Sequence, residues 1–168
     1  MNDIAPDRRV VLLSPLLSAL AASVTQASPI DPSETFVLQK DQIKFRSWGN
    51  IPPHSGETAM LYGDLDKPGP YLVLMRWNPG WFSAPHTYAT DRIQVVLSGT
   101  WWVNSGADFT PRDAVPVPAG GFAMRRARTP HYDGVPHDGK EPVEIAVLGM
   151  GPVDMALVDP TKPSWRQV

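Results

Sequence analysis

Short runs of alternating apolar and polar residues follow one another from residue 34 to residue 158, separated by clusters of Pro, Gly, Asn and Asp. Their enrichment in Val, Ile, Trp, Tyr and Phe is typical of β-strands. No long helical period and no internal repeat is visible, so the pattern predicts an all-β double-sheet jelly roll or sandwich. The expected strands are Glu34–Gln39, Ile43–Trp48, Glu57–Gly63, Tyr71–Trp77, Arg92–Ser98, Thr100–Asn104, Ala114–Val117, Gly121–Arg126, Arg128–Asp133, Val143–Gly149 and Val153–Val158.

One strand is apolar on both faces. In the run Tyr71–Trp77, the residues Tyr71, Val73, Met75 and Trp77 share one face, and the opposite face carries two leucines and an arginine. We expect this strand to be buried between two layers.

Composition narrows the class of protein. The 168 residues include 19 Pro and 13 Gly, which disfavours a helical bundle, and 42% hydrophobic against 19% charged residues excludes a disordered polymer. The net charge of −2 supplies no basic field for nucleic acid. The absence of cysteine excludes disulfides, thiolate chemistry, Fe–S clusters and Cys-type zinc sites.

The N-terminus has the features of a bacterial export signal. Arg8-Arg9 precede an apolar stretch, Val10–Val24, that is too short to span a bilayer comfortably, and Thr25 and Ala27 suit cleavage before Ser28. The pattern predicts export by the Sec or twin-arginine route to the periplasm or medium, with no membrane contact afterwards. The expected organisation is a signal over 1–27, a leader and first strand over 28–40, a barrel over 41–158 and a tail over 159–168.

Two segments carry the candidate chemistry. In the first, His86 and Tyr88 fall on one face if the chain is extended, and Arg92 and Gln94 share a face of the next strand. In the second, Thr129, His131 and Asp133 point the same way.

These segments resemble the two motifs of the cupin family. The first motif is matched by Gly80, His86, Tyr88, Arg92 and Gly99, and the second by Gly120, Arg126, Arg128, His131 and Val135. The resemblance covers about residues 40–158 and implies a double-stranded β-helix, or jelly-roll barrel, with a small-molecule ligand or substrate in its pocket. It also implies a homodimer formed by sheet extension, and a divalent metal held by three His and one Glu.

The sequence departs from that metal set, because Tyr88 replaces one His and Arg92 replaces the Glu. A guanidinium about 4 Å from a divalent ion would repel it by about 8 kcal/mol at an effective dielectric constant near 20. Three arrangements remain open. In one, Arg92 turns away or is neutralised, and His86, Tyr88 and His131 bind Fe, Ni, Mn or Zn with help from Gln94 or Asp133.

In the second arrangement no metal binds. Arg92 holds a carboxylate or phenolate, and His86, His131 and Tyr88 act as general acids or bases. In the third, Arg92 and Asp133 pair inside a barrel that binds a ligand without turnover. The resulting expectation is metal-assisted oxygenase or isomerase chemistry on a small organic molecule. The alternative is a metal-free cupin that binds an anionic or aromatic ligand through Arg92.

The remaining residues of interest are expected in the pocket, in the core or on the surface. The expected pocket residues are Met75, Phe82, Gln94, Met124 and Asp133. Asp133-Gly134 is also a turn signal that could end its strand. Core or subunit-interface positions are expected for Trp77, Trp81, Trp101 and Trp102, and surface positions for His54, His137, Arg125, Arg126 and Arg128.

Overall fold

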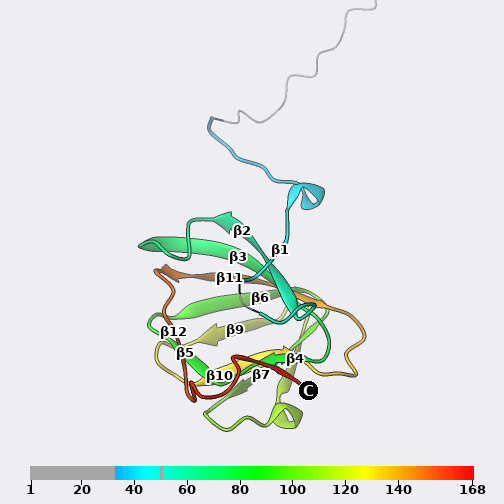
Figure 1. Ribbon diagram of the computed structural model, residues 1–168. Helices are drawn as coiled ribbons and strands as arrows, with labels where there is room; N and C mark the ends of the chain where they lie inside the picture. Colours follow the sequence, from blue (N-terminus) through cyan, green and yellow to red (C-terminus); the bar gives the residue numbers. More distant parts are fainter. Residues whose placement is uncertain (1–32, 50) are drawn as a thin grey trace, which may run out of the picture. The chain divides into compact units, whose positions relative to one another are not determined.

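The alternating runs fold into two antiparallel β-sheets that face each other (Figure 1). A computed structural model describes residues 33–49 and 51–168, and the predicted export signal lies outside these residues. The chain divides into two units, Met1–Leu38 and Gln39–Val168, and every strand among the described residues belongs to the second. No helix of the described part is long and apolar enough to cross a membrane.

Sheet A has the strand order β1-β2-β3-β11-β6-β9. Its strands are β1 (Arg46–Ser47), β2 (Gly56–Tyr62), β3 (Gly69–Trp77), β6 (Arg92–Ser98), β9 (Phe122–Arg125) and β11 (Val143–Gly151). Sheet B has the order β12-β5-β10-β4-β13, and β7 pairs with both β10 and β8. Its strands are β4 (Trp81–Ser83), β5 (His86–Tyr88), β7 (Thr100–Ser105), β8 (Val115–Pro118), β10 (His131–Val135), β12 (Met155–Leu157) and β13 (Trp165–Gln167). Two 3₁₀ turns are η1 (Lys40–Gln42) and η2 (Pro111–Asp113).

The inner face of sheet A forms most of the core. Along β3, the residues that share the inward face are all buried, as the alternation predicted. Val73 is paired with Val147 of β11, which is paired in turn with Gln94 of β6, so one row of the inner face ends in a polar side chain. The main buried cluster comprises Tyr71, Val73, Met75, Trp77, Val96, Trp101, Val135, Val143, Ile145 and Val147.

Several expected strand boundaries are wrong. The run Glu34–Gln39 contains no strand, and of Ile43–Trp48 only the two residues of β1 are paired. The strand expected from Arg128 begins at His131, because Arg128 has a φ of 57° and lies in a turn. The same strand continues through Gly134 to Val135, so Asp133-Gly134 does not end it.

Three short strands were not predicted. β4, β5 and β13 have three residues each, too few for a recognisable alternation. Strand β13 lies in the segment 159–168 that the sequence suggested was a tail, and it pairs with β4. Its residue Trp165 stacks on Trp77 with ring centroids 4.2 Å apart. This aromatic contact holds the C-terminal segment against the barrel.

Gly134 allows β10 to pack closely on β4. A Cβ at this position would overlap the Trp81 carbonyl oxygen and lie 2.6 Å from the Phe82 Cα. Both obstacles are backbone, so Gly134→Ala should lower the free energy of unfolding by about 3 kcal/mol, measured by urea denaturation. Gly120→Ala is the control, because a Cβ at Gly120 would have no neighbour within 4 Å. The φ of Gly120 is 83°, so only backbone strain of about 1 kcal/mol is expected there. Equal losses in the two variants would contradict the packing argument.

Candidate functional site

A cavity of about 340 Å³ lies between the inner faces of the two sheets. Apolar side chains of β3 and β11 form one wall, and polar side chains of β5, β6 and β10 form another. The expected pocket residues Met75, Gln94 and Asp133 line it, together with the candidate catalytic residues His86, Tyr88, Arg92 and His131. The sequence-derived site is therefore brought together in one place.

Two of the expected pocket residues lie elsewhere. Phe82 is fully buried in a second cluster with Ala114 and Tyr132, because it points to the other side of sheet B. Met124 is 44% exposed, since the β9 residue that faces inward is its neighbour Arg125. Neither residue lines the cavity, and both expectations are corrected.

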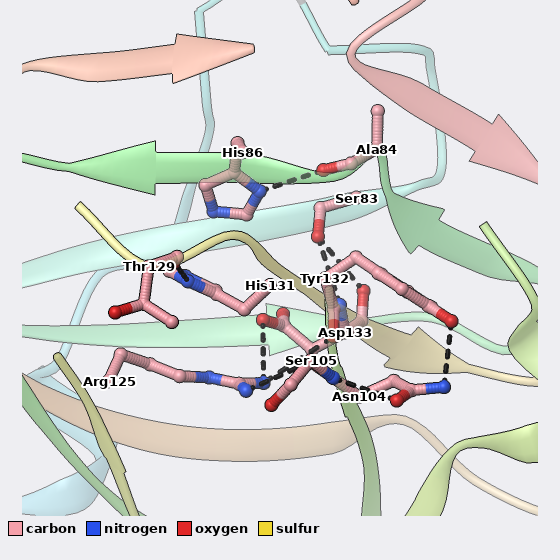
Figure 2. A network of polar contacts seen from close by, with 10 residues as sticks. All are labelled: Ser83, Ala84, His86, Asn104, Ser105, Arg125, Thr129, His131, Tyr132 and Asp133. Carbon is pink, nitrogen blue, oxygen red and sulfur yellow. Dashed lines mark hydrogen bonds and ion pairs between the residues drawn. The ribbon is translucent and has the colours of Figure 1, made fainter. Parts of the chain in front are cut away.

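His86 and His131 are direct cross-strand partners on β5 and β10. Their ring centroids are 4.5 Å apart. The His86 Nδ1 donates to the Ala84 carbonyl oxygen at 2.8 Å, and the His131 Nδ1 donates to the Thr129 carbonyl oxygen at 2.9 Å (Figure 2). Because a carbonyl can only accept, each Nδ1 carries the proton, and each Nε2 of the neutral rings keeps a free lone pair.

Burial keeps both imidazoles neutral. It lowers the pKa of His131 to about 4, with a further lowering from His86, while Asp133 opposes the shift. Burial also lowers the pKa of His86, again against the opposing effect of Asp133. At neutral pH the site therefore presents two proton acceptors rather than two cations.

Tyr88 and Arg92 form a contact between a phenol ring and a cation. The Arg92 Cζ lies 4.0 Å from the centre of the Tyr88 ring, which in turn is 5.0 Å from the centre of the His86 ring. Burial raises the pKa of Tyr88, and the adjacent Arg92 offsets this only in part, so the phenol stays protonated. Burial lowers the pKa of Arg92, but Tyr88 and Tyr71 more than offset it, and the guanidinium stays charged.

Asp133 is paired with Arg125 and not with Arg92. The Arg125 Nη2 lies 3.5 Å from the Asp133 carboxylate, and the same guanidinium donates to the Asn104 and Tyr132 carbonyl oxygens (Figure 2). This pair contradicts the third of the three arrangements left open by the sequence, in which Asp133 pairs with Arg92, and it corrects the expected surface position of Arg125. The cause is the inward orientation of Arg125 at the end of β9, opposite Arg92 in the register. Arg126 and Arg128 are exposed, as predicted.

Arg92 has no carboxylate partner within 4 Å among the described residues, and its Nε has no hydrogen-bond partner there. The buried charged side chains of the described part are Arg92, Arg125 and Asp133, so the interior carries one excess positive charge. Buried charges are normally compensated. An anion in the cavity would supply this compensation.

Three further polar atoms of the cavity wall have no hydrogen-bond partner in the described chain. They are the Gln94 Oε1 and the indole nitrogens of Trp77 and Trp101. Sequence reasoning placed both tryptophans in the core or an interface and missed the free N–H groups, although the alternation of β3 already turned Trp77 inward. Trp165, which also lines the cavity, was missed because Pro residues interrupt its segment.

The expected metal ligands do not fit a divalent cation. No three His, Cys, Asp or Glu side chains converge within the described residues. The available donors are two imidazoles, a protonated phenol and an amide oxygen, with a guanidinium against the phenol. The carboxylate of Asp133 also lines the cavity, but it is paired with the Arg125 guanidinium at 3.5 Å and so is not a free anionic donor for this set. Divalent sites of this kind are normally completed by a carboxylate or a further His.

Comparisons with solved structures agree on the fold. The polyketide cyclase RemF from Streptomyces resistomycificus is 13% identical, with a TM-score of 0.60 over 74% of this chain and 86% of that chain. An RmlC-like cupin from Ralstonia eutropha JMP134 is 13% identical, with a TM-score of 0.58 over 77% of this chain and 76% of that chain. DMSP lyase DddQ from Ruegeria pomeroyi DSS-3 is 14% identical, with a TM-score of 0.56 over 72% of this chain and 64% of that chain.

No protein-family model and no curated protein sequence matches the chain. Identities this low show the fold alone. The protein therefore has the double-stranded β-helix fold of RmlC-like cupins, as the two sequence motifs implied.

Proposed function

We propose that the protein is an exported cupin that binds a small organic anion on Arg92 and moves protons on it with His86 and His131. The observation that carries the proposal is the buried Arg92 guanidinium, which lacks a carboxylate partner within the described residues and lines the cavity beside two neutral imidazoles. A carboxylate or enolate would accept charge-assisted hydrogen bonds from Arg92 and balance the interior charge.

The chemistry that this arrangement supports is isomerisation or elimination next to an acidic group. A histidine Nε2 would remove a proton from carbon, and the electron pair would move into an enolate held by Arg92. In an isomerisation, the imidazolium would then return the proton to another carbon. In an elimination, the enolate electron pair would form a C=C bond as the bond to the leaving group breaks, and the imidazolium would protonate the departing group. Two fold neighbours, a polyketide cyclase and a DMSP lyase, support small-molecule chemistry of this general kind.

A pKa of about 4 makes His131 a weak base in the empty cavity. A bound anion changes this, because an added negative charge beside the ring favours the protonated form. The bound ligand would therefore raise the pKa of His131 toward the pH at which the protein works. Acid–base catalysis is most efficient when these two values are close.

Calorimetric titration with benzoate and with neutral benzamide tests the anion site. We expect benzoate to bind about 10- to 100-fold more tightly, since hydrogen bonds to charged groups contribute about 1.5–3 kcal/mol. At pH 6 benzoate binding should also take up protons, seen as a dependence of the heat on the buffer. His131→Asn, which retains a donor to the Thr129 carbonyl, should reduce that uptake. Equal affinities for the two probes would contradict the anion site, and benzoate binding without proton uptake would favour a binder over a catalyst.

The metal content of the protein tests the arrangement in which the cavity residues bind a divalent cation. The proposal requires no divalent cation, so neither the isolated protein nor the protein loaded with Fe²⁺, Mn²⁺, Ni²⁺ or Zn²⁺ should retain a stoichiometric amount. Near-stoichiometric metal that disappears in His131→Ala would overturn the metal-free proposal and return His86, Tyr88, Gln94 and His131 to the role of ligands.

A further inference from the structure

The outer face of sheet A is apolar and exposed over four strands. Eight large side chains point away from the cavity, each 38–64% exposed. They are Tyr62 on β2, Ile93, Val95 and Leu97 on β6, Phe122 and Met124 on β9, and Leu148 and Met150 on β11. We call this set the outer apolar face. Exposed apolar residues usually occur singly, so a patch of this size indicates an interaction surface.

The strand register makes the face continuous. One row of paired residues crosses five strands. From β2 to β9 its members are Tyr62, Leu72, Leu148, Ile93 and Met124. A second row places Val95 beside Phe122. The alternation that turns Arg92 and Gln94 into the cavity turns their neighbours Ile93 and Val95 outward, so the two surfaces are opposite sides of the same strand.

The outer apolar face carries no charge of its own. The charged groups next to it, on the same side of the sheet, are Arg76, Glu57 and Glu144. Arg76 is paired with Glu57 at 3.0 Å and with Glu144 at 3.1 Å, which leaves one excess negative charge at this border of the face. A neutral face does not repel its own copy and offers nothing to a charged peptide or to nucleic acid. Its composition is therefore self-complementary.

We propose that the outer apolar face binds a second copy of this chain, sheet against sheet about a two-fold axis. At about 200 Å² for a large apolar side chain, the exposed fractions of the eight residues amount to roughly 750 Å². That area is close to the roughly 800 Å² that each partner buries in a standard stable interface. In a two-fold arrangement the same patch serves both partners.

Face-to-face packing also suits the strands better than the sheet extension expected from the sequence. The edge strands of sheet A are β1, with two residues, and β9, with four. In sheet B, β8 contains Pro116 and Pro118, which have no N–H to donate to a partner strand. Short or proline-bearing edges form few intermolecular hydrogen bonds. Two apolar sheet faces, in contrast, pack as the layers of a sandwich do.

Sedimentation equilibrium of the purified full chain tests the proposal. The wild type should have twice the 18.4 kDa chain mass at micromolar concentration. Leu148→Glu and Phe122→Glu should each weaken self-association by about 30-fold or more, as loss of a central interface residue does. The matched control is Val115→Glu, which changes a 60% exposed residue of β8 in sheet B and should leave the dimer intact.

Circular dichroism establishes that each variant is folded, and benzoate binding by the monomeric variants establishes that the cavity is unchanged. A monomeric wild type would overturn the proposal, and so would a dimer that neither substitution at the outer apolar face weakens. A monomeric wild type that sediments with phosphatidylcholine vesicles would instead assign the face to lipid. The proposal is independent of the proposed function, because the face and the cavity are tested separately.

Discussion

Arg92→Met is expected to lower the affinity for benzoate by about 10- to 100-fold while leaving the protein at least as stable as the wild type. The loss follows from removing the one buried cation that has no carboxylate partner in the described part of the chain. Burial of a guanidinium without a carboxylate partner costs free energy, and its contact with the Tyr88 ring is worth only about 2 kcal/mol. Methionine fills a similar volume without the charge.

Calorimetry and urea denaturation measure the two effects of Arg92→Met. Arg126→Met is the control, because Arg126 is an exposed arginine just beyond β9 and its loss should change neither quantity. A variant that binds benzoate normally would show that Arg92 does not hold the anion. A large loss of stability would show that Arg92 is mainly a structural residue of the barrel.

Acid should destabilise the protein through His131. Its pKa is about 4 in the folded chain and about 6.5 when unfolded, so between these pH values the unfolded chain binds more protons. The stabilisation is fully present above about pH 6.5 and is lost as the pH falls toward 4, by about 3 kcal/mol in total. His86 acts in the same direction, since burial lowers its pKa as well.

Urea denaturation at a series of pH values between 4 and 7 measures this effect. His131→Asn should flatten the dependence, because the asparagine does not titrate. His54→Asn should leave it unchanged, since His54 is exposed. If His131→Asn retains the full wild-type slope, acidic groups elsewhere cause the acid sensitivity and the assignment to His131 is wrong.

Local sequence patterns were enough to predict the long strands of sheet A. Alternation identifies β2, β3, β6 and β11 because each has seven to nine residues, long enough for one face to show a period of two. Strands of three residues show no period. The longer β10 pairs with β4 and β5, and β13 pairs in turn with β4, so these strands are defined by their partners. The pairing partner is a property of the tertiary structure.

The same distinction applies to the site. Motif spacing identified His86, Tyr88, Arg92 and His131, because each lies at a fixed distance from a Gly in its own segment. Which charge pairs with which could not be inferred in this way. Arg125 pairs with Asp133 because the register of β6 and β9 places Arg125 opposite Arg92, on the inward side of β9. The preceding residue of β9 points outward and is exposed.

The fold class, the long strands and the histidines of the cavity could therefore be predicted, since they depend on residue type and short spacing. Three features follow only from the way the strands come together. Among the described residues Arg92 is left without a carboxylate, the N–H groups of two tryptophans that line the cavity are buried without a partner, and sheet A exposes an apolar outer face. Those features depend on contacts between strands far apart in the chain. Such contacts determine which buried charge is compensated and which surface is left for a partner.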